Sequence, residues 1–164
     1  SGGAGYVGSS LVPDLLSRGH KVTVYDIMYF GYDFLPKNNP NLKLIEGDIR
    51  DDNKVKSSCA NHDAFIHLDC ISNDASFQLD EKLSTSINFE AFEPMVLAAK
   101  KSGIKRFIHA STSSVYGISD KKDVKLAAID VLSLTAFPIL LPKDFATIAA
   151  KGITISANNA SFQF

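Results

Sequence analysis

The first eight residues, from Ser1 to Gly8, contain glycines at positions 2, 5 and 8, directly before an apolar helix pattern. Glycine lacks a Cβ, so the chain can turn sharply there and its N–H groups can approach a bound group closely. A turn that opens a helix also collects unpaired N–H groups and the positive end of the helix dipole at one point. This combination suits a pyrophosphate.

An aspartate follows the glycine turn at the spacing found in dinucleotide-binding folds. The run Lys21 to Asp26 predicts a short buried strand that ends in a carboxylate. It lies about 20 residues beyond the glycines, where dinucleotide-binding folds place the acid that bonds the adenosine ribose. An Asp favours NAD, because a 2′-phosphate beside it would meet a like charge. Taken singly, the glycine turn could be only a helix cap and Asp26 only a turn residue; together they favour nucleotide binding.

Strands alternate with helices along the first two thirds of the chain. The predicted strands are 21–26, 42–46, 63–68 and 104–110. The predicted helices are one after the glycine turn, one over 52–60 and one over much of 81–101, with a loop through Asp80 before the last. This alternation predicts an α/β fold with a parallel, doubly wound sheet. Ligands of such sheets bind beyond the carboxyl ends of the strands, and the candidate polar residues follow those ends.

Composition narrows the function classes. The chain has 164 residues, 45% of them hydrophobic, which is enough for one domain with a real core. The net charge is −1 without a long run of one sign, so we expect no nucleic-acid partner and no anionic membrane surface. No stretch approaches 18 apolar residues, so no membrane span is expected. The two cysteines lack metal-ligand spacing and fit a reduced, cytoplasmic setting.

Six short motifs occur in a characteristic order. They are Gly-Gly-Ala-Gly-Tyr-Val-Gly-Ser, Val-Tyr-Asp, Gly-Asp-Ile-Arg-Asp, His-Leu, Ser-Gly-Ile-Lys-Arg-Phe-Ile and Ser-Thr-Ser-Ser-Val-Tyr-Gly. As a set they resemble the NAD-dependent epimerase/dehydratase family, the extended short-chain dehydrogenases that act on nucleotide sugars. The resemblance covers residues 1–120 and implies a Rossmann-type domain that holds NAD. It also implies a nucleotide-sugar substrate and a homodimer.

The resemblance assigns roles to individual residues. Those at the pyrophosphate would be Gly2, Gly5, Tyr6, Val7 and Gly8. Asp26 would bond the adenosine ribose, Asp48 and Ile49 would flank the adenine, Leu68 would line the cofactor, and Asn88 would lie near the nicotinamide. Two alternatives stay open: Asp48 as a cap of the following helix, and Asn88 as an exposed polar residue.

The catalytic residues of the family match only in part. There, a tyrosine phenolate takes the hydroxyl proton of the sugar while NAD takes hydride, and a lysine four residues on lowers the tyrosine pKa. Thr112 matches the Ser/Thr that bonds the sugar hydroxyl; alternatively it is a loop residue bonding its own backbone. None of the 5 tyrosines follows Tyr116, so the Tyr-x-x-x-Lys pair is absent. We therefore expect an inactive chain from an enzyme family, with a catalytically dead nucleotide-binding module or a scaffold protein as alternatives.

The ends of the chain depart from the family pattern. The strand expected before the glycine turn is absent, so we expect a Rossmann sheet lacking its first strand and the C-terminal substrate domain. Residues 121–164 form an atypical tail, which we interpret as frame-shifted or degenerate. Asp69 stands where the family has a small residue, and its charge is expected to repel a pyrophosphate. Pro94 falls inside a predicted helix, where proline costs about 3 kcal/mol unless the helix is kinked.

Overall fold

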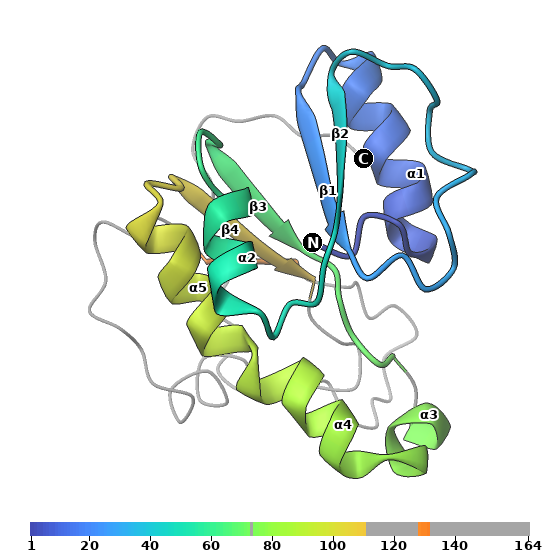
Figure 1. Ribbon diagram of the computed structural model, residues 1–164, viewed down its shortest axis with the longest axis vertical. Helices are drawn as coiled ribbons and strands as arrows, with labels where there is room; N and C mark the ends of the chain where they lie inside the picture. The colour runs from blue at the N-terminus through green and yellow to red at the C-terminus, as the bar shows by residue number, and fades with distance from the viewer. Residues whose placement is uncertain (73, 111–127, 132–164) are drawn as a thin grey trace, which may run out of the picture.

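A computed structural model of the chain describes residues 1–72, 74–110 and 128–131 (Figure 1). In chain order the elements are α1 (Tyr6–Ser17), β1 (Val22–Asp26), β2 (Leu42–Glu46), α2 (Asp52–Ser58), β3 (Ala64–His67), α3 (Asp74–Leu79), α4 (Glu81–Thr85), the π-helix η1 (Ser86–Glu90), α5 (Phe92–Lys101), β4 (Arg106–Ala110) and β5 (Ala128–Val131). All four predicted strands and the helices after the glycine turn and after residue 51 are confirmed.

The strands form two sheets, with the first residues of the chain between them. β1 pairs with β2 and β3 with β4, both in parallel, whereas β5 is antiparallel to β4. The Gly2 N–H donates to the Tyr25 carbonyl at 3.0 Å, and the Leu68 N–H donates to the Ser1 carbonyl at 3.1 Å. The N-terminal residues therefore bond to β1 on one side and to the end of β3 on the other, so both sheets direct their carboxyl ends to one place (Figure 1).

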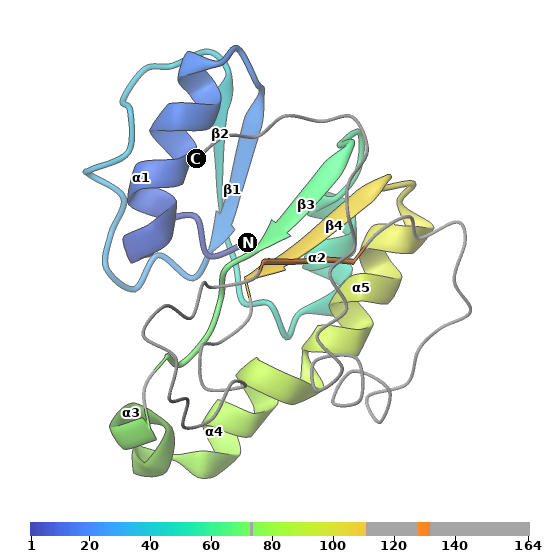
Figure 2. The ribbon, with the colours of Figure 1, turned by 180° about the vertical axis from the view of Figure 1, so that it is seen from behind.

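The described helices lie on opposite faces of the sheet region. On one face α1 packs on β1, and on the other α2 and α5 pack over β3 and β4 (Figures 1 and 2). Val24 and Tyr25 are neighbours in β1 and belong to different core clusters, at 2% and 3% exposure. Strands buried on both faces are typical of parallel sheets with helices on each side. The predicted Rossmann-type, doubly wound α/β class is confirmed.

Two elements were not predicted from the sequence. The segment before Asp80, expected to be a loop, contains the short helix α3. The buried Ser84 hydroxyl of α4 donates to the Phe77 carbonyl at 3.2 Å, so a tertiary contact ties this helix to the next. Helices this short are not stable on local propensity alone. β5 lies inside the predicted tail, and it forms by pairing with β4, whose partner residues are at least 18 positions away in sequence (Ala110 with Ala128).

The predicted helix over 81–101 is divided into α4, η1 and α5. The Ala91 N–H donates to the Ser86 carbonyl at 3.1 Å, a π-type bond, and α5 begins one residue later. Pro94 thus lies in the first turn of α5, where a missing N–H leaves no helical bond unmade. The expected penalty at Pro94 is avoided by this change of register. The predicted C-terminal end of the helix at Ser102-Gly103 is confirmed, since Ser102 caps α5 and Gly103 has a φ of 82°.

Gly8 allows the glycine turn to fold back on α1. A Cβ at Gly8 would lie 2.3 Å from the Gly3 carbonyl oxygen, a backbone atom that cannot rotate away. We expect Gly8→Ala to lower the free energy of unfolding by about 1–3 kcal/mol, the usual range for overpacking. Urea unfolding followed by circular dichroism measures this. Ser10→Ala, at an exposed position of the same helix, is the matched control; equal midpoints for the two variants would contradict the prediction.

Candidate functional site

The Asp26 carboxylate lies directly against the glycine turn. Its Oδ2 accepts the Ala4 N–H at 2.9 Å, and its Oδ1 accepts the Met28 N–H at 2.8 Å. Asp26 is buried, with 8% of its surface exposed. The turn and the acid, 22 residues apart in sequence, are therefore in contact at the carboxyl end of β1. The structure brings together the two features on which the sequence argument depended.

The start of α1 presents backbone donors without a competing acid. Its N-cap is Gly5, no side chain caps it, and its first turn contains no acidic residue. Tyr6 and Val7, the first helical residues, are 95% and 56% exposed. N–H groups at this position have no partner within the helix. The helix start can therefore accept an anion.

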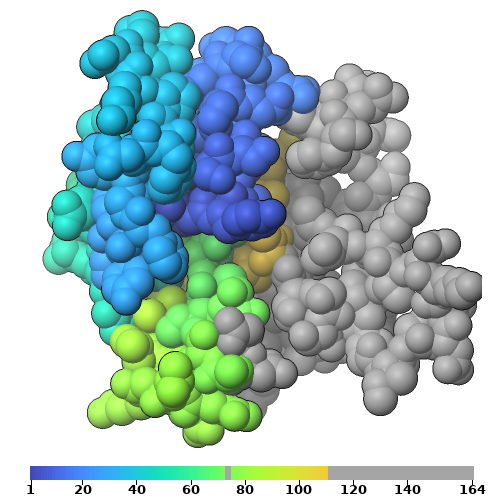
Figure 3. Space-filling view, turned by 90° about the vertical axis from the view of Figure 1, so that its right-hand side faces the viewer, coloured from blue at the N-terminus to red at the C-terminus, as the bar shows by residue number. Residues whose placement is uncertain are grey.

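The glycines of the turn provide space for close approach rather than free hydrogen-bond donors. The N–H groups of Gly2 and Gly5 are used internally, by the Tyr25 and Gly2 carbonyls. A Cβ on Gly2 would lie 2.7 Å from the Asp69 nitrogen and 3.1 Å from the Leu68 Cβ. Close approach of β3 to the turn thus depends on Gly2, and it places Leu68 beside the turn. Figure 3 shows the first residues (dark blue) between the loop after β1 and the segment after β3.

Asp48 and Ile49 lie in the loop after β2, which is tied to β1. The Gly47 N–H donates to the Asp26 carbonyl at 2.8 Å, and the Tyr25 hydroxyl donates to the Asp48 carbonyl at 2.7 Å. Ile49 is buried in the core beneath α2 and α5. This loop therefore lies next to the Asp26 end of β1, as expected for residues serving one ligand.

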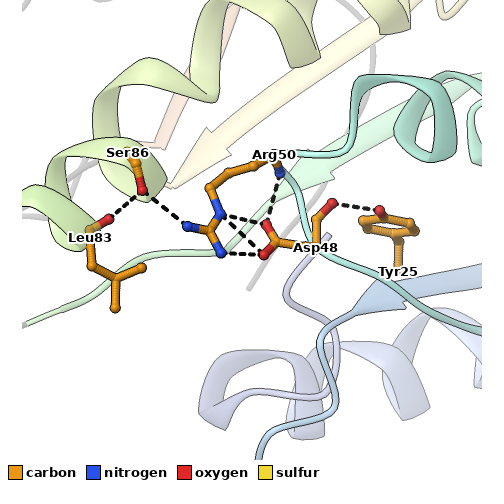
Figure 4. A network of polar contacts seen from close by, with 5 residues as sticks. All are labelled: Tyr25, Asp48, Arg50, Leu83 and Ser86. Atoms are coloured by element: carbon orange, nitrogen blue, oxygen red, sulfur yellow. Dashed lines mark hydrogen bonds and ion pairs between the residues drawn. The ribbon is translucent and has the colours of Figure 1, made fainter.

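The Asp48 carboxylate pairs with Arg50 (Figure 4). The side-chain hydrogen bond from Arg50 holds the Asp48 pKa below its usual value. The alternative in which Asp48 caps the next helix is wrong. The N-cap of α2 is Asp51, whose side chain accepts the Lys54 N–H at 3.0 Å. Sequence reasoning identified Asp48 but missed Arg50 as its partner.

Asn88 binds the loop after β3. Its Oδ1 accepts the Ile71 N–H at 2.8 Å, and its Nδ2 donates to the Ile71 carbonyl at 3.0 Å. The alternative of an exposed polar residue at Asn88 is wrong, because Asn88 is half-buried and its amide bonds the backbone that leaves β3. Thr112 lies outside the described residues.

Two histidines lie at the carboxyl ends of β3 and β4, and an aspartate follows β3. The buried His67 has its Nδ1 3.3 Å from Asp69 Oδ2, and its ring stacks on His109 with centroids 5.1 Å apart. Burial raises the Asp69 pKa, but the hydrogen bond from His67 and nearby positive charge outweigh it, so the pKa lies below its usual value. Asp69 therefore carries its charge beside a histidine. Its expected repulsion of a pyrophosphate stays a prediction.

Within the described ranges, no group of three His, Cys, Asp or Glu side chains could hold a metal ion. In the same part of the chain, no helix has the length and apolar character needed to cross a membrane.

A model of the NAD dependent epimerase/dehydratase family matches residues 1–133. The chain belongs to this family. It is 36% identical over 123 residues to a UDP-N-acetyl-alpha-D-glucosaminuronate decarboxylase of Bacillus cytotoxicus, covering 71% of this chain and 36% of that protein. It is 31% identical over 119 residues to a 3-beta-hydroxysteroid dehydrogenase of Mycolicibacterium neoaurum, covering 70% of this chain and 31% of that protein.

The fold resembles that of a dTDP-glucose 4,6-dehydratase from Streptomyces venezuelae, solved with NAD bound. The TM-score is 0.67 at 27% identity, over 75% of this chain and 41% of that one. The chain spans about a third of the length of these curated relatives. As a member of an NAD-dependent family, it has the α/β architecture of the cofactor-binding part.

The stacked histidines predict a pH dependence of stability. Burial, followed by the charge of His67, lowers the His109 pKa to about 4, against about 6.5 for an unperturbed histidine. The unfolded chain then binds more protons between these values, so stability falls as pH drops through about 6.5 toward 4.

His109→Gln removes the titrating group. We expect its melting temperature to fall less than that of the parent chain between about pH 7 and pH 5. Differential scanning calorimetry across this range gives both slopes. Parallel slopes for the variant and the parent chain would contradict the assignment.

Proposed function

We propose that this chain is the NAD-binding part of a nucleotide-sugar epimerase or dehydratase, a class that transfers hydride between bound NAD and a sugar carbon. The observation that carries the proposal is the contact between the Asp26 carboxylate and the Ala4 N–H of the glycine turn. It joins an anion-accepting helix start to an acid that can bond ribose hydroxyls.

Different site residues bind different parts of the dinucleotide. The pyrophosphate lies at the amides of Tyr6 and Val7, where Gly2, Gly5 and Gly8 leave room for close approach. Asp26 bonds the adenosine ribose, Asp48 and Ile49 flank the adenine, and Leu68 lines the cofactor. Asn88 acts toward the nicotinamide through the Ile71 loop that it holds. Bound NAD would supply the hydride acceptor; the protein residues described here bind and orient it.

The substrate class rests on two relatives named for nucleotide sugars, a decarboxylase and a dehydratase. A steroid dehydrogenase is also among the relatives, so the substrate must be tested directly. We propose a nucleotide sugar, with Thr112 bonding its reacting hydroxyl, a homodimeric assembly and a cytoplasmic setting. Residues 1–120 would be the cofactor domain and 121–164 the atypical tail.

The proton-transfer step lacks a phenol in the expected place. The Tyr25 hydroxyl donates to the Asp48 carbonyl, and burial raises the Tyr25 pKa to about 12. A phenol with a raised pKa and a committed proton is a poor base at neutral pH. We therefore propose that this chain binds NAD without oxidising a sugar. Binding of NAD with neither transient NADH absorbance nor conversion of UDP-glucose to an epimer or dehydrated sugar would support this catalytically silent module.

Asp26→Asn tests the cofactor site. The amide cannot replace both carboxylate acceptors or repel a 2′-phosphate, so we expect the Kd for NAD to rise about tenfold, with a smaller change for NADP. One charge-assisted hydrogen bond is worth about 1.5–3 kcal/mol. Isothermal titration calorimetry gives both constants.

Asp14→Asn is the matched control, because Asp14 lies late in α1 and pairs with the exposed Arg18 at 2.9 Å. The NADP-to-NAD ratio of Kd values is independent of the folded fraction, so it separates loss of recognition from partial unfolding. An unchanged Kd for NAD and an unchanged ratio would refute the proposal.

A further inference from the structure

Arg50 engages Asp48 through its own backbone and side chain. Its N–H and Nε donate to Asp48 Oδ1, both at 2.9 Å, and Nε and Nη2 donate to Oδ2. The remaining arm, Nη1, lies 3.3 Å from the Ser86 hydroxyl of η1. Ser86 donates its own proton to the Leu83 carbonyl at 2.7 Å, so its oxygen is an acceptor for Arg50 (Figure 4).

These bonds leave little freedom to the Asp48 carboxylate. A carboxylate offers about four acceptor positions. Arg50 supplies three N–H hydrogens, because its single Nε–H is shared between Oδ1 and Oδ2, and among the described residues these hydrogens fill about three of the positions. The carbonyl of Asp48 is also fixed, since it accepts the Tyr25 hydroxyl at 2.7 Å and the Asp51 N–H at 3.0 Å. Asp48 therefore presents about one open acceptor in a fixed direction.

Stability alone is a weak explanation for this arrangement. The side chains of Arg50 and Asp48 are 40% and 31% exposed, and ion pairs this exposed contribute little to stability. What the pair does change is geometry, because Arg50 joins the loop after β2 to a helix 36 residues away. That helix also holds the Ile71 backbone through Asn88. Arg50 thus fixes the Asp48 carboxylate relative to the loops that follow β2 and β3.

We propose that Arg50 is a specificity-determining positioning residue for the base of the dinucleotide. It fixes the Asp48 carboxylate so that its open acceptor takes the exocyclic amino group of adenine. A hypoxanthine ring, which presents a carbonyl oxygen there, meets a lone pair instead. Without Arg50 the carboxylate can rotate toward the ring N–H of hypoxanthine, and discrimination falls. This inference rests on the proposed NAD site.

The test compares NAD with nicotinamide hypoxanthine dinucleotide by calorimetry. We expect the parent chain to bind NAD at least about tenfold more tightly, since hypoxanthine places a carbonyl oxygen instead of a donor against the open Asp48 acceptor. Arg50→Gln should reduce this ratio about fivefold or more. Arg50→Lys should also reduce it, because an ammonium cannot reproduce the forked contact.

Arg18→Gln is the matched control, since Arg18 forms an exposed pair with Asp14 at the other end of α1. It should keep the parental ratio. The inference is overturned if Arg50→Gln keeps the parental ratio, or if both Arg50 variants weaken the two dinucleotides equally, as a purely structural role would. If NAD binding depends on Asp26 but the Arg50 variants leave the ratio of the two dinucleotides unchanged, this inference alone is refuted. Absence of NAD binding by the parent chain would sink the proposed function with it.

Discussion

The hydrogen bond from the Ala4 amide to the Asp26 carboxylate is the constraint on which the candidate site depends. A buried carboxylate is costly to desolvate unless donors compensate it. Here two backbone N–H groups, from Ala4 and Met28, supply that compensation. The same bonds fix the turn before α1 against the end of β1. An anion-accepting helix start and an acidic group thereby share one edge of the sheet.

The other strand ends are fixed to this point by contacts of the same kind. The loop after β2 is held through Gly47 and Tyr25, and the end of β3 is held against Gly2. The helical segment from Glu81 to Lys101 then reaches two of these loops, through Ser86 and Asn88. Polar bonds at the sheet edge therefore do the positioning, while the apolar clusters on both faces supply the packing.

The π-helix has a structural consequence that a regular helix would not provide. It changes the register between α4 and α5, so that Pro94 comes into a first turn where its missing N–H is harmless. It also carries both Ser86 and Asn88. π-type turns within helices are frequent at functional sites, and here the turn lies where the two loops are held.

The residues and elements that the sequence predicted are those whose causes are local. The glycine pattern, the apolar run ending at Asp26 and the strands at 42–46 and 63–68 follow from backbone sterics and short-range periodicity. The family motifs added the proposed roles of Asp48 and Asn88. Tertiary structure alone decided two contacts of these loops: Arg50, the partner of Asp48, bonds Ser86, and Asn88 bonds the Ile71 backbone. It also decided β5, which forms by pairing with β4. Each of these depends on a bond between distant segments, and no local pattern records such a bond because its free energy appears only after the sheets have brought the segments together.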